Sequence, residues 1–180
     1  MTALVVAVHR SARHAFSKET VEGVRLLEGL GVEGDAHSGT TVQHRSRVRF
    51  NPALPNLRQV HLLHAELLDD LGTAGHPVRP GELGENVTTR GIDLLGLPVG
   101  TRLHLGEKAV VVVTGLRNPC KQIEAFRPGL LEHVVRPRDT GPPALLAGVM
   151  ATAARSGDVS AGDQVGVELP PEPHRYLAKV

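Results

Sequence analysis

Apolar and polar residues alternate along several short stretches of this chain, which is the pattern of strands that bury one face. Residues 101–105 follow a period of two and meet an apolar run at 109–114 across Gly106-Glu107-Lys108, so we expect a β-hairpin there. The four consecutive valines at 110–113 predict a strand in the core. Further strands are predicted at 4–8, 60–63 and 165–169.

Helical periodicity is scarcer than strand periodicity. One helix is predicted at 65–71, stopped at Gly72, and another at 129–135, before Pro137. Short strands separated by Gly and Pro turns favour a mainly β fold, a closed or nearly closed β-barrel with a few short helices.

Two long polar or proline-containing stretches predict loops, one at 36–57 and a surface connector at 136–143. We therefore expect a single domain over residues 1–169, followed by an extended, loosely held tail at 170–180.

Composition narrows the classes of function. The chain has 180 residues with 20 basic and 19 acidic side chains, so its formal charge of +1 gives no overall attraction to nucleic acid or membrane. With no Trp, one Tyr and three Phe, platforms for stacking bases are scarce. The single cysteine excludes an internal disulfide and, with an apolar run at 4–8 too short for a signal segment, predicts a cytoplasmic location.

That cysteine, Cys120, is the leading candidate for chemistry. It follows the valine run and stands between Arg117 and Lys121, and nearby cations favour the thiolate, which attacks electrophiles, carries sulfur or binds a soft metal. The alternative is a buried, inert cysteine that packs as a small hydrophobe.

Two glycine-containing segments supply further polar groups. In residues 80–91, Asn86, Thr88 and Arg90 offer donors suited to a heterocycle or a phosphate, unless they belong to a turn and an ordinary strand. In residues 31–39, Asp35 could orient His37 for proton transfer, although an Asx turn with solvated histidines explains the same pattern. Glycine-rich nucleotide motifs, His-Glu-x-x-His and Cys-x-x-Cys are missing from the sequence.

Taken together, ordered blocks of the sequence resemble the MOSC domain, named for the C-terminal region of molybdenum-cofactor sulfurases. The resemblance covers about residues 15–167 and is carried by 17–18, 34–37, 58–63, 81–91, 97–101, 114–120, 147–150 and 162–163. It implies a β-barrel similar to the barrel domain of pyruvate kinase, and a protein that handles the pterin-based molybdenum cofactor or sulfur for metal centres.

The resemblance also implies roles for particular residues. Cys120 would be the molybdenum ligand or sulfur acceptor, with Asp35 and His37 as proton donors near the open coordination position. The remaining expected cofactor contacts, to the phosphate and the pterin, are Lys18, Asn86, Thr88, Arg90, Arg117 and Asn118.

The expected activity is reduction of N-hydroxylated bases or amines by a molybdopterin-type cofactor. The chain has no room for a pyridoxal-phosphate, flavin or iron–sulfur module, so electrons would come from a separate donor protein. The alternative is a persulfide carrier or insertion factor without redox turnover, supplied by a separate pyridoxal-phosphate cysteine desulfurase. A barrel that binds a partner without chemistry is a third possibility.

Overall fold

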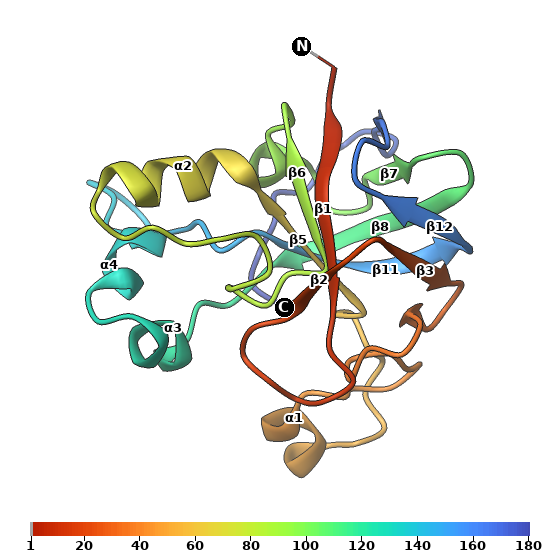
Figure 1. Cartoon of the computed structure of the whole chain (residues 1–180), viewed down its shortest axis with the longest axis horizontal. Helices are drawn as coiled ribbons and strands as arrows, with labels where there is room; N and C mark the ends of the chain where they lie inside the picture. The colour runs from red at the N-terminus through yellow and green to blue at the C-terminus, as the bar shows by residue number, and fades with distance from the viewer. Residues whose placement is uncertain (1) are drawn as a thin grey trace.

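The protein is mainly β with a few short helices (Figure 1). This computed structural model describes residues 2–180, with the side chains of residues 45–47 outside the description. The strands are β1 Leu4–Arg10, β2 Glu19–Val21, β3 Gly23–Leu27, β4 Gly31–Val32, β5 Val60–His64, β6 Val87–Arg90, β7 Arg102–Leu105, β8 Ala109–Leu116, β9 Val135–Arg136, β10 Ala144–Leu145, β11 Val149–Arg155, β12 Gly157–Ser160 and β13 Val165–Glu168. The α-helices are α1 Arg45–Phe50, α2 Ala65–Thr73, α3 Lys121–Phe126 and α4 Leu130–Val134, and a 3-10 helix, η1, spans Leu94–Gly96.

Eight strands form the main sheet in the order β13-β7-β8-β11-β5-β6-β1-β2. Adjacent strands in this sheet are antiparallel, except for β5 and β6. These two are parallel because the chain passes through α2 between them. A second sheet has the order β12-β3-β4, and β9 pairs with β10. The mainly β class is therefore confirmed.

A closed barrel is not confirmed. Among residues 2–180 no strand pairing joins the edge strands β2 and β13. The chain before β13 nevertheless returns to β1, because the Val5 N–H donates to Asp163 O at 2.8 Å and the Val165 N–H donates to Ala3 O at 2.9 Å. These bonds curve the sheet back on itself without completing a continuous ladder.

The predicted hairpin forms as β7 and β8, with Arg102 opposite Val112 and Leu105 opposite Ala109. Val110, Val111 and Val113 are fully buried, as expected for a core strand. One apolar cluster lies on the sheets and includes Val111 and Val113, and a second lies among α2, α3 and α4 around Leu67 and Ile123.

Helix α2 continues past Gly72, which was expected to end it. No neighbouring atom crowds Gly72, and the turn falls at Gly75, whose φ of +86° is the left-handed conformation that favours glycine. The second predicted helix is α4. Helices α1 and α3 were not predicted, because six residues carry too little periodicity to be recognised.

The C-terminal tail is extended but not loosely held. Leu116, at the end of β8, donates its N–H to Ala178 O at 2.8 Å and accepts from the Val180 N–H at 3.2 Å, while the Val99 N–H donates to Arg175 O at 2.9 Å. Residues 175–180 therefore run back along the sheet. No helix in residues 2–180 has the length and apolar character that a membrane crossing requires.

Candidate functional site

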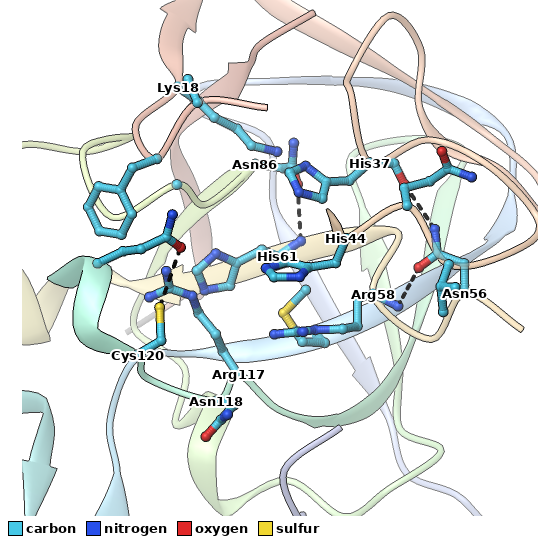
Figure 2. Close-up of a pocket in the computed structure, with 17 residues that line it drawn as sticks. Lys18, His37, His44, Asn56, Arg58, His61, Asn86, Arg117, Asn118 and Cys120 are labelled. Atoms are coloured by element: carbon cyan, nitrogen blue, oxygen red, sulfur yellow. Dashed lines mark hydrogen bonds between the residues drawn. The ribbon is translucent and has the colours of Figure 1, made fainter. Parts of the chain in front are cut away.

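A cavity of about 400 Å³ opens where several loops and strand ends converge (Figure 2). The lining residues come from segments far apart in sequence: Ala15, Phe16, Lys18, His37, Val42, Gln43, His44, Asn56, Arg58, His61, Gly84, Asn86, Arg117, Asn118, Cys120, Gln122 and Met150. We call the side that is bonded to β1 through Asn86, formed by Lys18 and Asn86 with Asp35 behind them, the β1 wall, and the side formed by Arg117, Asn118 and Cys120 the β8 wall.

The β8 wall is the loop that leaves β8 and enters α3. The Arg117 N–H donates to Gly148 O at 3.0 Å, which fixes the start of this loop. The Arg117 guanidinium carbon lies 5.8 Å from the centre of the Phe16 ring, within the range of a cation–π contact. Its Nη1 is buried and has no hydrogen-bond partner among the described residues.

An unpartnered guanidinium N–H in a cavity wall is a costly arrangement for the protein alone. Burial lowers the pKa of Arg117, and the nearby Cys120 and Glu85 oppose that shift. Because an arginine side chain stays charged in proteins, Nη1 offers a positively charged donor to a ligand that brings an acceptor.

Cys120 precedes α3 and is partly exposed, with its Sγ 3.4 Å from Gln122 Oε1. It lines the same cavity as Arg117 and Asn118. The alternative of a buried cysteine therefore does not match the structure, in which Cys120 is partly exposed. The thiol is accessible for metal ligation or sulfur transfer.

The β1 wall is built on a buried ion pair. Lys18 Nζ lies 2.6 Å from Asp35 Oδ2, and both side chains are almost inaccessible to solvent. The same Oδ2 accepts from Asn86 Nδ2 at 3.1 Å and from the Ser11 N–H at 3.2 Å, and Oδ1 accepts from the His37 N–H at 2.9 Å.

These bonds decide the protonation state of Asp35. Burial alone would raise its pKa, but the hydrogen bonds from His37 and the charge and hydrogen bond of Lys18 outweigh burial, so the pKa is lowered. Asp35 is therefore a fixed carboxylate and a poor proton donor. Of the two residues predicted to supply protons, His37 is the better placed, because its partly exposed ring lines the cavity with Nδ1 3.3 Å from Asp35 Oδ1.

Asn86 lines the cavity, but its amide is largely used by the protein. Nδ2 donates to His9 O at 3.2 Å as well as to Asp35, and Oδ1 accepts from the His61 N–H at 3.1 Å. Asn86 thus ties β1 and β5 together at the cavity, and little of its hydrogen-bonding capacity is left for a ligand.

Thr88 lies behind the cavity rather than on it. Its Oγ1 is 3.0 Å from His9 Nε2 and donates to Glu85 Oε1 at 3.0 Å, and Glu85 also accepts from the Gly81 N–H at 2.6 Å. Burial and the charge of Lys18 lower the pKa of His9 to about 4, so its imidazole is neutral near pH 7. Burial raises the pKa of Glu85.

Arg90 does not reach the cavity. Its Nη1 lies 2.7 Å from Asp69 Oδ2 at the surface, where both side chains are well exposed. Of the predicted site residues the structure thus gathers Lys18, His37, Asn86, Arg117, Asn118 and Cys120 around the cavity, with Asp35 directly behind, and leaves Thr88 and Arg90 outside it.

Several lining residues were not predicted as site residues. Arg58 and His61 belong to the block 58–63, which is one of those that resemble the MOSC domain. Membership of this block is the signal that could have identified them as site residues. His61 is buried in β5 with Nε2 2.8 Å from Ala147 O, and burial with the charge of Arg117 keeps its pKa well below the usual value. Phe16, His44 and Gln122 had no comparable signal.

Gly84 shows why glycine is needed beside the cavity. Its φ is +83°, and an added Cβ would collide with the carbonyl oxygen of Phe16, so the segment 84–86 can pass close to the segment that precedes β2 only with glycine at this position.

The charges of the cavity favour an anionic ligand. Arg58 and Arg117 line it, the charge of Lys18 is compensated by Asp35, and none of its lining residues within 2–180 is Asp or Glu. No cluster of three or more His, Cys, Asp and Glu in that part of the chain is placed to hold a metal ion.

Comparisons with known proteins agree with this fold. The model of the MOSC domain matches residues 37–166. The YuaD protein from Bacillus subtilis has a TM-score of 0.76 at 24% identity, over 98% of this chain and 97% of that one. YiiM from Escherichia coli has a TM-score of 0.63 at 21% identity, over 97% of this chain and 73% of that one. YiiM from Geobacillus stearothermophilus has a TM-score of 0.59 at 18% identity, over 93% of this chain and 73% of that one. No curated protein sequence matched the chain significantly.

Proposed function

Since this chain belongs to the MOSC domain family, which is linked to molybdenum-cofactor-related function, we propose that it binds a molybdopterin-type molybdenum cofactor in the cavity and reduces N-hydroxylated bases or amines. The observation that carries the proposal is the buried, unpartnered Nη1 of Arg117, in the same cavity as the accessible thiol of Cys120.

The lining residues fit the chemistry of such a cofactor. Its phosphate needs several donors, and Arg117, Arg58 and Asn118 line one cavity in which no carboxylate is found among residues 2–180. The volume of about 400 Å³ lies within the usual range for small-molecule sites. When bound, the cofactor would supply a redox-active metal for which the Cys120 thiolate is a soft ligand.

The reaction also requires a source of protons in the protein. Removing the oxygen of R–NHOH breaks the N–O bond, consumes two electrons and two protons, and gives R–NH₂ and water. His37 is the proposed proton source, because Asp35 holds its Nδ1 while the side chain remains partly open to solvent. The electrons would come from a separate protein.

A persulfide carrier is the second candidate, and the partial exposure of Cys120 favours it. In that reaction the Cys120 thiolate attacks the terminal sulfur of a persulfide on a cysteine desulfurase, the donor S–S bond breaks, and the donor cysteine leaves as thiolate. This step needs neither the anion site at Arg117 nor a proton from His37.

One experiment separates the two candidates. Protein from a host that makes the cofactor is assayed for reduction of an N-hydroxylated base with viologen, reduced by dithionite, as electron donor. We expect molybdenum-dependent turnover, and a loss of roughly 10²-fold in His37→Gln with molybdenum content unchanged. Molybdenum-loaded protein without turnover, together with labile sulfur on Cys120, would contradict the reductase and support the carrier.

A further inference from the structure

The loop beside the cavity mouth has an unusual surface. This loop, residues 40–58 and hereafter the mouth loop, carries α1 and projects away from the sheets, at the bottom of Figure 1. Its base is closed by backbone bonds, from the Val42 N–H to Leu54 O and from the Asn56 N–H to Thr40 O, each 2.9 Å. The mouth loop is therefore a projection whose base is held by backbone hydrogen bonds.

The base of the mouth loop is also part of the cavity wall. Val42, His44, Asn56 and Arg58 line the cavity, and Asn56 Nδ2 donates to His37 O at 2.9 Å. Whatever docks on the mouth loop is thereby brought to the cavity opening and close to the backbone of the proposed proton donor.

The mouth loop contains basic residues but no acidic ones. No Asp or Glu occurs between Ala36 and Ala65, whereas the mouth loop contains Arg45, Arg47, Arg49 and Arg58. The whole chain has a formal charge of only +1, so positive charge is concentrated here and balanced elsewhere. A segment with this excess of positive charge attracts an acidic surface and raises the rate of encounter with it.

The mouth loop also exposes apolar side chains. Phe50 is 89% exposed and Val48 39%, and the same loop exposes Leu54 at 40% and Leu57 at 45%. Arginine beside exposed aromatic and aliphatic side chains is the composition typical of protein–protein interfaces.

From these observations we infer that the mouth loop docks an acidic redox protein, with carboxylates around an apolar patch, that carries flavin or an iron–sulfur cluster. The electron-donor role of this partner rests on the reductase function proposed above. The exposed Arg49 and the net positive charge of the mouth loop attract the acidic partner, and Phe50 with Val48 supplies the apolar contact, so the donor is placed at the cavity opening.

Other occupants fit the mouth loop less well. A second copy of this chain would bring two basic loops together, which like charges oppose. Nucleic acid would leave the exposed aliphatic side chains Val48, Leu54 and Leu57 without a partner, since phosphates and base edges bind polar groups. A membrane surface calls for a longer amphipathic helix than the six residues of α1.

Two acidic proteins serve as probes, a flavodoxin and a plant-type [2Fe–2S] ferredoxin, titrated against the purified protein by calorimetry at low salt. We expect at least one to bind saturably, and its affinity to fall steeply as NaCl rises from about 50 to about 300 mM. Arg49→Glu and Phe50→Ser should each weaken that binding about fivefold or more. Both side chains are exposed, so the fold should survive these changes.

Matched variants and a second readout make the test specific. Arg138→Glu, in the connector after β9, and Tyr176→Ser, a 97% exposed aromatic in the tail, change charge and apolar surface outside the mouth loop and should leave binding unchanged. Turnover driven by the bound probe should fall in Arg49→Glu and Phe50→Ser, while viologen-driven turnover should equal that of wild type.

Failure of this inference can be told apart from failure of the proposed function. Absence of viologen-driven turnover would contradict the reductase, whereas the binding titrations do not depend on turnover. The docking inference is overturned if neither probe binds, if Arg49→Glu and Phe50→Ser bind as wild type does, or if the mouth loop instead mediates self-association, DNA binding or attachment to anionic vesicles.

Discussion

The two walls of the cavity differ in how their polar atoms are satisfied. In the β1 wall the charges of Lys18 and Asp35 neutralise each other at 2.6 Å, and Asn86 adds bonds to both β1 and β5. In the β8 wall the buried Arg117 keeps an N–H without a partner, and the Cys120 thiol is partly exposed. The first wall is complete without a ligand, whereas the second is not.

This difference distinguishes the residues of the cavity that support the fold from those that are available to bind a ligand. Polar residues that satisfy each other hold the fold, and their loss should be seen as lower stability. Polar residues left unsatisfied in a cavity wall are kept at a cost to the protein alone, and their loss should be seen as weaker ligand retention. Lining a cavity is therefore not by itself a sign of contact with the ligand.

The largest expected effect is on the β1 wall. Asp35→Asn removes the charge that compensates the buried Lys18, so the free energy of unfolding should fall by about 3–5 kcal/mol. Urea unfolding measures it, and Asp35→Asn combined with Lys18→Met should recover part of the loss. A single variant as stable as wild type would show that the pair does not support the fold.

A pH titration tests the same wall through His9. In the unfolded chain this imidazole takes up a proton below its ordinary pKa of 6.5, but in the folded chain only below about 4. Unfolding therefore binds a proton between these values, and stability falls as the pH drops from 6.5 to 4, by at most about 3 kcal/mol from this residue.

His61 and His64, whose pKa values are also lowered by burial, add to the same slope. His9→Gln should flatten the dependence of the urea midpoint on pH without abolishing it. An unchanged slope in this variant would mean that His9 is not held neutral by the fold.

The β8 wall should respond in the opposite way. Arg117→Met removes a buried, incompletely bonded cation, so the cofactor-free protein should be as stable as wild type or more stable. Cofactor retention should weaken by about 1.5–3 kcal/mol for each lost charge-assisted hydrogen bond. Equilibrium dialysis against released cofactor measures the second effect. Reduced stability with unchanged cofactor retention would show that Arg117 supports the fold, as the residues of the β1 wall do.

The smallest effect is expected at Arg90. Its ion pair with Asp69 is exposed, so Arg90→Ala should change the free energy of unfolding by less than about 1 kcal/mol and leave cofactor content as in wild type. This variant is the control for the loss of an arginine elsewhere, and a drop in cofactor content would require the site to extend along β6.

The different outcomes for these residues show what the sequence can predict. Alternation at 101–105 and the apolar run at 109–114 predicted the β7–β8 hairpin directly, because both patterns are local properties. The ordered family blocks indicated Cys120 and Arg117, which do line one cavity. Curvature of the sheet could not be predicted in the same way, because the bonds between β1 and residues 162–165 join the two ends of the chain.

Arg90 shows the limit of reasoning from a motif. It lies only four residues beyond Asn86, but a strand advances about 3.3 Å per residue, so the end of β6 is roughly 13 Å from the cavity and faces α2 instead. Thr88, between them, meets His9 rather than the cavity. Asp35 was correctly associated with His37, but the charge of Lys18 that keeps it ionised depends on a tertiary contact.

The most direct test of the account is the molybdenum and pterin content of wild type and Cys120→Ser, both purified from a host that makes the cofactor. We predict near-stoichiometric molybdenum with pterin in wild type, and loss of the metal from Cys120→Ser at unchanged stability, because serine keeps the shape but not the soft thiolate ligand. Wild-type protein without molybdenum, or equal molybdenum in both proteins, would contradict it.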